Sequence, residues 1–260
     1  MNQNTVIDVQ HVTKVYGKKT EKQYTALKDV NFKVRQGEFV GIMGASGSGK
    51  TTLLNILATM DKPTEGRVLV GNQDITKLDG NQVSDFRAKQ IGFIFQDFNL
   101  LESLTNAENI GLPLTLQGAK KRKTNELVHQ VAGQLGINQL LDKYPVEISG
   151  GQKQRVAAAR GLISRPQILF ADEPTGALDS RNARELLETL KQVNDEEQVS
   201  VLMVTHDPFS ASYCERILFI KDGKIGEQLE AGDQKRSEFY QTILNKLGTF
   251  NDQGEDVDVI

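Results

Sequence analysis

The stretch Gly44-Ala45-Ser46-Gly47-Ser48-Gly49-Lys50-Thr51 matches the pattern G-x-x-x-x-G-K-[ST] at every position. An apolar run at 38–43 precedes it and predicts a short buried strand, and the run at 51–58 that follows predicts a helix. A strand, a glycine-rich turn and a helix in this order are the context that a phosphate-binding loop requires. A flexible Gly/Ser loop that matched by chance would not be expected to carry both flanking elements.

The residue types of this stretch suit the phosphates of a nucleotide. Glycines let backbone N–H groups approach phosphate oxygens, and the helix N-terminus adds a partial positive charge. We expect Lys50 to reach the β- and γ-phosphates and the Thr51 hydroxyl to ligate Mg²⁺. Thr52 follows in the same helical turn and is grouped with them. The sequence therefore predicts a nucleoside triphosphate site with a bound metal ion.

Composition and charge narrow the class of protein. The chain has 260 residues, of which 38% are hydrophobic and 25% charged, as is ordinary for a soluble globular protein. Its net charge of −3 gives no electrostatic reason to expect nucleic-acid binding. Cys214 is the only cysteine, so the chain forms no internal disulfide. We find neither a signal-peptide layout nor an apolar run that would span a bilayer, so work at a membrane would need a second, spanning chain.

Apolar periodicity predicts an α/β protein. Two mostly alternating stretches, 6–12 and 26–34, indicate strands near the N-terminus. The segment 97–161 has helical patterns and no convincing strand, and we interpret it as a helical insert. The acidic end, 251–258, is expected to be disordered. The other predicted elements are strands at 67–71, 91–95, 167–171 and 199–204, helices at 85–90, 152–162 and 181–194, a hairpin at 216–225 and an amphipathic helix at 238–247.

Two carboxylates directly follow a predicted strand. Asp172 and Glu173 come after the apolar run 168–171, which we expect to lie beside the strand of the phosphate loop. There the first carboxylate would join the shell of the Mg²⁺ ion, and the second would orient or deprotonate a water. A solvated turn with two acids is the alternative interpretation. The phosphate loop upstream favours the metal and water roles.

His206 and Tyr16 are less specific candidates. A lone histidine is usually structural, but His206 follows the predicted strand 199–204. At a third strand end, on the edge that carries the phosphate loop, it becomes a candidate for contact with the γ-phosphate. Tyr16 stands before Gly17, either as an ordinary turn aromatic or as a platform for a stacked base. Spacing alone favours the turn aromatic.

One further motif relates these candidate residues to a known protein family. Ile148-Ser149-Gly150-Gly151-Gln152 resembles the signature motif of ATP-binding-cassette (ABC) proteins, in which leucine is usual at the first position. The other motifs of that family are present in order over residues 5–226. They are Tyr16 for the adenine-stacking aromatic, Gly44–Thr51 for the Walker A loop, Gln96 for the Q-loop, Asp172 for Walker B, Glu173 for the catalytic glutamate, Gly176–Asp179 for the D-loop and His206 for the switch histidine.

The resemblance implies a fold and a chemistry. The fold would be a P-loop NTPase core of the RecA-like type, with an antiparallel β subdomain and a helical subdomain at about 97–161. Residues 5–226 would form the nucleotide-binding domain, and 227–260 a C-terminal extension with an amphipathic helix and an acidic tail. The chain would hydrolyse ATP, with ATP and Mg²⁺ as cofactors. The residues implied to be catalytic are Lys50, Glu173 and His206, and those implied to hold the metal are Thr51, Gln96 and Asp172.

The resemblance also implies partners. In this family two copies sandwich two ATP molecules head to tail, and the signature motif of one chain completes the site of the other. Here Ser149, Gly150, Gly151 and Gln152, with Asp179, would bind the nucleotide held by a second copy. The helical subdomain would dock onto an integral membrane permease. That would place the chain in the cytoplasm, peripheral on the inner face of the cell membrane.

A narrower resemblance rests on segments that carry less of the chemistry. The macrolide-exporter and lipoprotein-release group is resembled by the long connection from Tyr16 to Ala26 and by residues 93–101 and 172–179. Within that group, residues 203–208 with 211–214 look most like the ATP-binding subunits of bacitracin-resistance transporters. Such subunits pair with a large permease and often with a sensor kinase. Two other interpretations are a soluble ABC ATPase that acts on nucleic acid or ribosomes and a module that binds ATP without hydrolysis. The single cassette and the acidic charge disfavour the first, and Glu173 with His206 disfavours the second.

Overall fold

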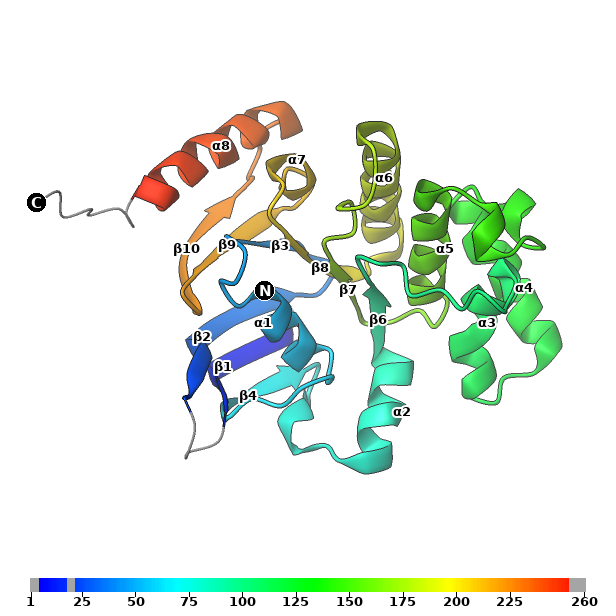
Figure 1. Cartoon of the computed structure of the whole chain (residues 1–260), viewed down its shortest axis with the longest axis horizontal. Coiled ribbons are helices and arrows are strands. Elements are labelled where there is room, and N and C mark those ends of the chain that lie inside the picture. The colour runs from blue at the N-terminus through cyan, green and yellow to red at the C-terminus, as the bar shows by residue number, and fades with distance from the viewer. Residues whose placement is uncertain (1–4, 18–21, 253–260) are drawn as a thin grey trace, which may run out of the picture.

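A six-stranded sheet with the order β10-β9-β3-β8-β7-β6 forms the core of the computed structural model, which describes residues 5–17 and 22–252 (Figure 1). Five of these strands run parallel, and β10 returns antiparallel to β9. Every residue of β3 and β8 is buried, as continuous apolar runs between two covered faces require. The strands are β3 (Phe39–Met43), β6 (Ile91–Ile94), β7 (Ile168–Asp172), β8 (Ser200–Thr205), β9 (Arg216–Lys221) and β10 (Lys224–Glu230).

A smaller antiparallel sheet has the order β2-β1-β4-β5. Strand β2 alternates buried and exposed positions over 30–35, whereas β1 alternates only in part, with Val6 and Ile7 both buried. Helix α1 (Lys50–Leu57) packs with residues of both sheets in one apolar cluster, so it is covered on both sides. The strands are β1 (Thr5–Tyr16), β2 (Tyr24–Arg35), β4 (Glu65–Val70) and β5 (Gln73–Asp74).

Helices cover the opposite face of the large sheet. Consecutive residues of a strand face opposite sides, so Leu202 packs in the cluster with α1 while Val201 and Met203 pack with α5, α6 and α8. No helix in the ranges that the structure describes is long and apolar enough to cross a membrane. The helices are α2 (Gly80–Gln90), α3 (Asn106–Leu116), α4 (Lys121–Gln134), α5 (Gly150–Leu162), α6 (Ser180–Glu197), α7 (Pro208–Ala211) and α8 (Arg236–Asp252), with short 3₁₀ turns η1 (Ile75–Lys77), η2 (Asn138–Leu140) and η3 (Pro145–Glu147).

The α/β fold class is confirmed, with differences at element ends. The predicted helical insert contains α3, α4 and α5 and no strand between 97 and 161. Helix α2 begins at Gly80, five residues before the predicted start at 85, and α8 continues past the predicted end at 247 to Asp252. The predicted acidic tail beyond residue 252 lies outside the described residues.

One prediction about the sheet is wrong. Strand β7, which ends in Asp172, is not beside the phosphate-loop strand β3, because β8 lies between them. Apolar runs report that a strand is buried but do not identify its neighbours. The carboxylate still reaches the site, because parallel strands end on the same edge of the sheet.

Candidate active site

Three glycines give the loop between β3 and α1 its shape. Gly47 and Gly49 have φ of +78° and +107°, in the left-handed region that side chains disfavour. A Cβ atom on Gly44 would lie 2.2 Å from the carbonyl oxygen of Ile220. The loop therefore passes close to β9 and wraps the N-terminus of α1 with its backbone, the arrangement that binds phosphate.

Lys50 is buried and lies over this loop. Its Nζ atom donates to the carbonyl oxygens of Gly44 at 2.8 Å and Ala45 at 2.9 Å. Burial lowers the pKa of the Lys50 amine, and the charges of Glu173 and Asp172 oppose that shift. The ammonium group therefore shares one electrostatic environment with both predicted carboxylates, although they come from a strand two positions away in the sheet. Thr51 follows Lys50 in the first turn of α1.

The structure brings Glu173 and His206 into direct contact. The Nδ1 atom of His206 lies 2.9 Å from Oε1 and 2.8 Å from Oε2 of Glu173. Glu173 has a φ of +46°, which is strained for a residue with a side chain, and its N–H donates to the carbonyl of Val204 at 2.9 Å. The end of β8 therefore fixes the residue that follows β7. The sequence prediction that both side chains gather at this edge is confirmed.

Within the part of the chain that the structure describes, two buried oxygen atoms at this edge have no hydrogen-bond partner, Oδ1 of Asp172 and Oγ of Ser48. Burial raises the pKa of Asp172, and the neighbouring charge of Glu173 raises it further. Buried polar atoms normally have a partner, so an unpaired carboxylate oxygen beside a phosphate loop fits a bound cation, and an unpaired hydroxyl fits a phosphate oxygen. The residues present at this edge therefore fit a metal–nucleotide complex.

Tyr16 is the last residue of β1 and not a turn residue. Its hydroxyl donates to Oδ2 of Asp61 at 2.7 Å, and the Nζ atom of Lys14 lies 4.7 Å from its ring centroid. Burial and Asp61 raise the pKa of the Tyr16 hydroxyl, which also interacts with Thr52 on α1. Tyr16 as a whole is 40% exposed, so it is held in place while surface remains for a stacked base.

Gln96 and Asp179 lie in the connections beyond β6 and β7. The Nε2 atom of Gln96 lies 3.4 Å from the place that a Cβ atom on Gly176 would occupy, so Gln96 approaches the D-loop segment 176–179. The Asp179 side chain accepts from the N–H groups of Arg181 at 3.0 Å and Asn182 at 2.9 Å, and these bonds cap α6. The hydrogen bonds from Asn182 lower the pKa of Asp179.

The segment 148–152 begins α5 away from the phosphate loop. Ser149 caps the helix, with its Oγ accepting from the N–H of Gln152 at 3.3 Å and its own N–H donating to Oε1 of Gln152 at 3.0 Å. Gly151 packs against α6, since a Cβ atom there would lie 2.5 Å from the Asn182 side chain. In Figure 1 strands β7 and β6 separate α5 from α1. The structure therefore does not bring Ser149–Gln152 to the Lys50 of the same chain.

Arg160 is a residue that the sequence analysis missed. Its guanidinium donates to the carbonyl oxygen of Phe98 at 2.8 Å and to that of Asn99. Phe98 and Asn99 have φ of +62° and +49°, so one side chain on α5 holds two consecutive left-handed residues just after Gln96. Burial lowers the pKa of Arg160. Asn99, a residue type that tolerates this conformation, was the one local hint in the sequence.

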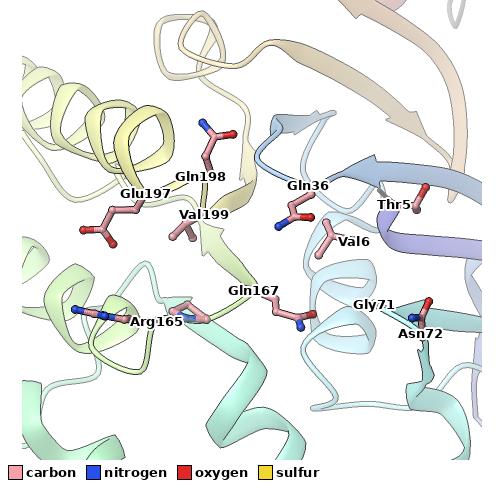
Figure 2. Close-up of a pocket in the computed structure, with 11 residues that line it drawn as sticks. Thr5, Val6, Gln36, Gly71, Asn72, Arg165, Gln167, Glu197, Gln198 and Val199 are labelled. Atoms are coloured by element: carbon pink, nitrogen blue, oxygen red, sulfur yellow. The ribbon is translucent and has the colours of Figure 1, made fainter. Parts of the chain in front are cut away.

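A pocket of about 690 Å³ lies elsewhere. Figure 2 shows Gln36, Gln167 and Gln198 around it, which precede β3, β7 and β8. It therefore lies where the parallel strands begin, opposite the edge that carries the phosphate loop. It contains none of the predicted site residues.

Comparison with known proteins supports what this geometry indicates. A family model described as "ABC transporter" matches residues 27–176. The chain belongs to the ABC transporter family. Among its ABC relatives is the "Bacitracin export ATP-binding protein BceA" of Halalkalibacterium halodurans, 49% identical over 243 residues that cover 94% of this chain and 96% of that one. The ABC transporter ATP-binding protein YxdL of Bacillus subtilis is 46% identical, with 97% of each chain covered.

A solved ABC cassette shares the architecture. It is the dimeric, post-hydrolysis state of MJ0796 bound to ADP and Pi, which superposes with a TM-score of 0.80 at 39% identity. That match covers 86% of this chain and 98% of the other. The chain is therefore an ATP-binding subunit of an ABC transporter and an ATPase.

Proposed function

We propose that this ABC ATPase powers a separate membrane permease in resistance to antimicrobial peptides of the bacitracin type. The contact between Glu173 and His206, beside Lys50 and Asp172, carries the hydrolytic part of the proposal. Near full-length similarity to a bacitracin export ATP-binding protein supports the physiological part. A lipoprotein-release or macrolide-type system is the alternative, and a soluble ABC ATPase outside transport is the less favoured one.

The site residues are assigned roles that follow their positions. The loop from Gly44 to Thr52 and the ring of Tyr16 bind ATP, and Lys50 neutralises the β- and γ-phosphates. Thr51, Gln96 and Asp172 hold Mg²⁺, which supplies positive charge beside the phosphates. Glu173 accepts a proton from the attacking water, and His206 fixes the Glu173 carboxylate and contacts the γ-phosphate. The unpaired oxygens of Ser48 and Asp172 support this assignment.

The proposed partners of the chain are a second copy of itself and a permease. Ser149, Gly150, Gly151 and Gln152 offer a helix N-terminus to the ATP held by the second copy, with Asp179 at the same interface. The dimeric form of the MJ0796 cassette supports this assembly. The permease connects the complex to the membrane, so we place the chain in the cytoplasm on the inner membrane face, with a sensor kinase reached through the permease and no nucleic acid.

The proposed domains of the chain are consistent with these roles. Residues 5–226 form the nucleotide-binding domain, in which 97–161 is the subdomain that meets the permease. Residues 227–260 form a C-terminal extension. Phe239 and Ile243 of α8 are buried in the cluster on the helical face of the large sheet, which supports an extension that packs on the domain.

Replacement of Glu173 by glutamine tests the proposal. Glu173→Gln keeps the size of the side chain and its polar contact with His206 but removes the base. We expect the ATPase rate to fall at least about 100-fold, which is the lower range for loss of a general base. ATP should then hold the variant as a dimer, observed by size-exclusion chromatography with light scattering.

A matched control is Glu196→Gln on the exposed face of α6, where Glu196 accepts from Gln192. It should hydrolyse ATP at the wild-type rate. Glu173→Gln with a wild-type rate would remove Glu173 from catalysis. In cells that carry the permease, Glu173→Gln should abolish resistance to bacitracin, and resistance that changes only toward a macrolide would favour the alternative system.

A further inference from the structure

A buried hydroxyl pair joins the segment after Glu173 to the segment after His206. Thr175 Oγ1 and Ser210 Oγ lie 2.8 Å apart. Thr175 is 8% exposed and Ser210 is fully buried. Thr175 stands two residues after Glu173, and Ser210 lies in α7, the short helix that begins two residues after His206. The pair therefore connects the two segments that carry the Glu173–His206 contact.

The direction of this hydrogen bond follows from the neighbours. Ser210 Oγ donates its one proton to Oδ2 of Asp207 at 2.7 Å, so Thr175 must be the donor to Ser210. Asp207 also accepts from the N–H groups of Phe209 at 3.1 Å and Ser210 at 3.0 Å. A directed chain thus runs from Thr175 through Ser210 to the carboxylate of the residue that follows His206.

The conformation of Glu173 shows why such a link matters. A left-handed glutamate persists only where its surroundings hold it, and φ of Glu173 is +46°. The backbone bond to Val204 holds one side of the residue. On the other side the N–H of Gly176 donates to the Glu173 carbonyl at 2.9 Å and closes a turn that contains Thr175. Thr175 is the residue of that turn whose side chain forms a hydrogen bond to α7.

We propose that Thr175 and Ser210 are positioning residues for ATP hydrolysis, whose hydrogen bond keeps the Glu173 carboxylate against His206. The proposal rests on the proposed roles of Glu173 and His206. Neither hydroxyl touches those two side chains, so the pair acts through the backbone of the two segments. Loss of the bond would leave nucleotide binding at the P-loop unchanged and would reduce the rate of the chemical step.

Four variants of the full-length protein test the pair by steady-state ATPase kinetics. Thr175→Val keeps the shape and removes the donor, Thr175→Ser keeps the donor, Ser210→Ala removes the acceptor, and the double variant combines Thr175→Val with Ser210→Ala. We expect Thr175→Val to lower kcat about tenfold, as loss of a buried hydrogen bond would, with KM for ATP nearly unchanged. Thr175→Ser should restore kcat. The double variant should be no slower than the slower single variant.

Controls separate positioning from general destabilisation. Thr189→Val removes a hydroxyl that donates to the carbonyl of Glu185 on α6, away from the site, and should keep the wild-type kcat. Hydrogen exchange should show faster opening at 173–176 and 206–210 in Thr175→Val and not in Thr175→Ser. Additive losses in the double variant, or a wild-type kcat in Thr175→Val, would overturn the proposal.

The same assay includes Glu173→Gln, so the two proposals fail in different ways. If Glu173→Gln is inactive while Thr175→Val keeps its kcat, only the role of the hydroxyl pair falls. If Glu173→Gln hydrolyses ATP at the wild-type rate, the role of Glu173 falls and the positioning proposal falls with it.

Discussion

Asp172 carries its charge in an unfavourable place. Burial and the adjacent charge of Glu173 both raise its pKa, and Oδ1 has no hydrogen-bond partner among the described residues. A carboxyl group whose pKa is higher in the folded state than in the unfolded state favours folding at low pH. Above both pKa values that advantage is gone. The protein therefore folds with an unfavourable interaction at the site where a metal would bind.

The prediction at this residue is a gain of stability without nucleotide. Asp172→Asn removes the charge and should raise the thermal midpoint at pH 8 by about 2 °C. The gain should shrink as the pH falls toward the ordinary range of an aspartate, because the wild-type carboxyl then becomes neutral too. Thermal unfolding in EDTA at pH 8 and pH 5 measures both values, with the exposed Asp142→Asn as control. A lower midpoint for Asp172→Asn at pH 8 would contradict the prediction.

The positions of residues at strand ends were predictable, and contacts that depend on loop conformation were not. Asp172, Glu173 and His206 each follow an apolar run, and parallel strands bring such positions together. The contact of Arg160 with Phe98 depends on a left-handed backbone that phenylalanine does not favour. At Phe98 no local pattern encodes that conformation, which is held by a contact across 62 residues.

At the level of elements, α5 connects the segment 148–152 with the segment around Gln96. Its first residues carry the capping box of Ser149 and Gln152, and its other end carries Arg160. Between them the Nε2 atom of Gln154 donates to the carbonyl of Phe95 at 3.2 Å. One helix therefore holds the backbone on both sides of Gln96, and we expect the signature motif and this segment to move as one body.

Removal of the Arg160 guanidinium tests that expectation. Arg160→Met keeps the buried aliphatic part but loses the bonds to Phe98 and Asn99, and should cost about 2 kcal/mol in free energy of unfolding. Hydrogen exchange at 97–101 should become faster than in the wild type. Arg122→Met, which removes only the exposed pair with Glu126, is the control and should cost less than about 0.5 kcal/mol. Unchanged exchange at 97–101 in Arg160→Met would show that the turn holds itself.

The elements themselves were predicted well because their signals are local. Buried parallel strands appear as apolar runs, and β1 and β2 appear as alternation. The position of β8 between β3 and β7 was missed because strand order depends on how distant segments pack. The start of α2 was missed because its first residues carry no apolar period and only Phe86 of that helix is buried.

For the whole molecule, the separation of α5 from the phosphate loop implies a site built from two chains. A mixture of two inactive variants tests this. Lys50→Met disables the P-loop of one chain, and Ser149→Arg disables the signature motif of the other. In a head-to-tail mixed dimer both defects fall in one site and the second site is intact. We therefore expect the mixture to regain ATPase activity that neither variant shows alone.

The reference is an equal mixture of wild-type protein with each variant, which sets the activity that mixed dimers reach when only one defect is present. A mixture of the two variants that stays as inactive as its components would place the Ser149 defect in the site of its own chain. That result would refute the head-to-tail arrangement, even though each variant alone is inactive as expected.

The order of the large sheet also has a consequence for folding of the chain during its synthesis. Strand β3 is wholly buried, yet its neighbours β8 and β9 are not made until synthesis has passed residue 200. We expect β1, β2 and β4 to pair early, because they are close in sequence. Until β8 and β9 are made, both edges of the apolar strand β3 stay unpaired, and such edges promote aggregation. Strand β8, which finally covers β3, also delivers His206. The nascent chain therefore brings His206 to the edge that carries the phosphate loop only when β3 is covered by β8.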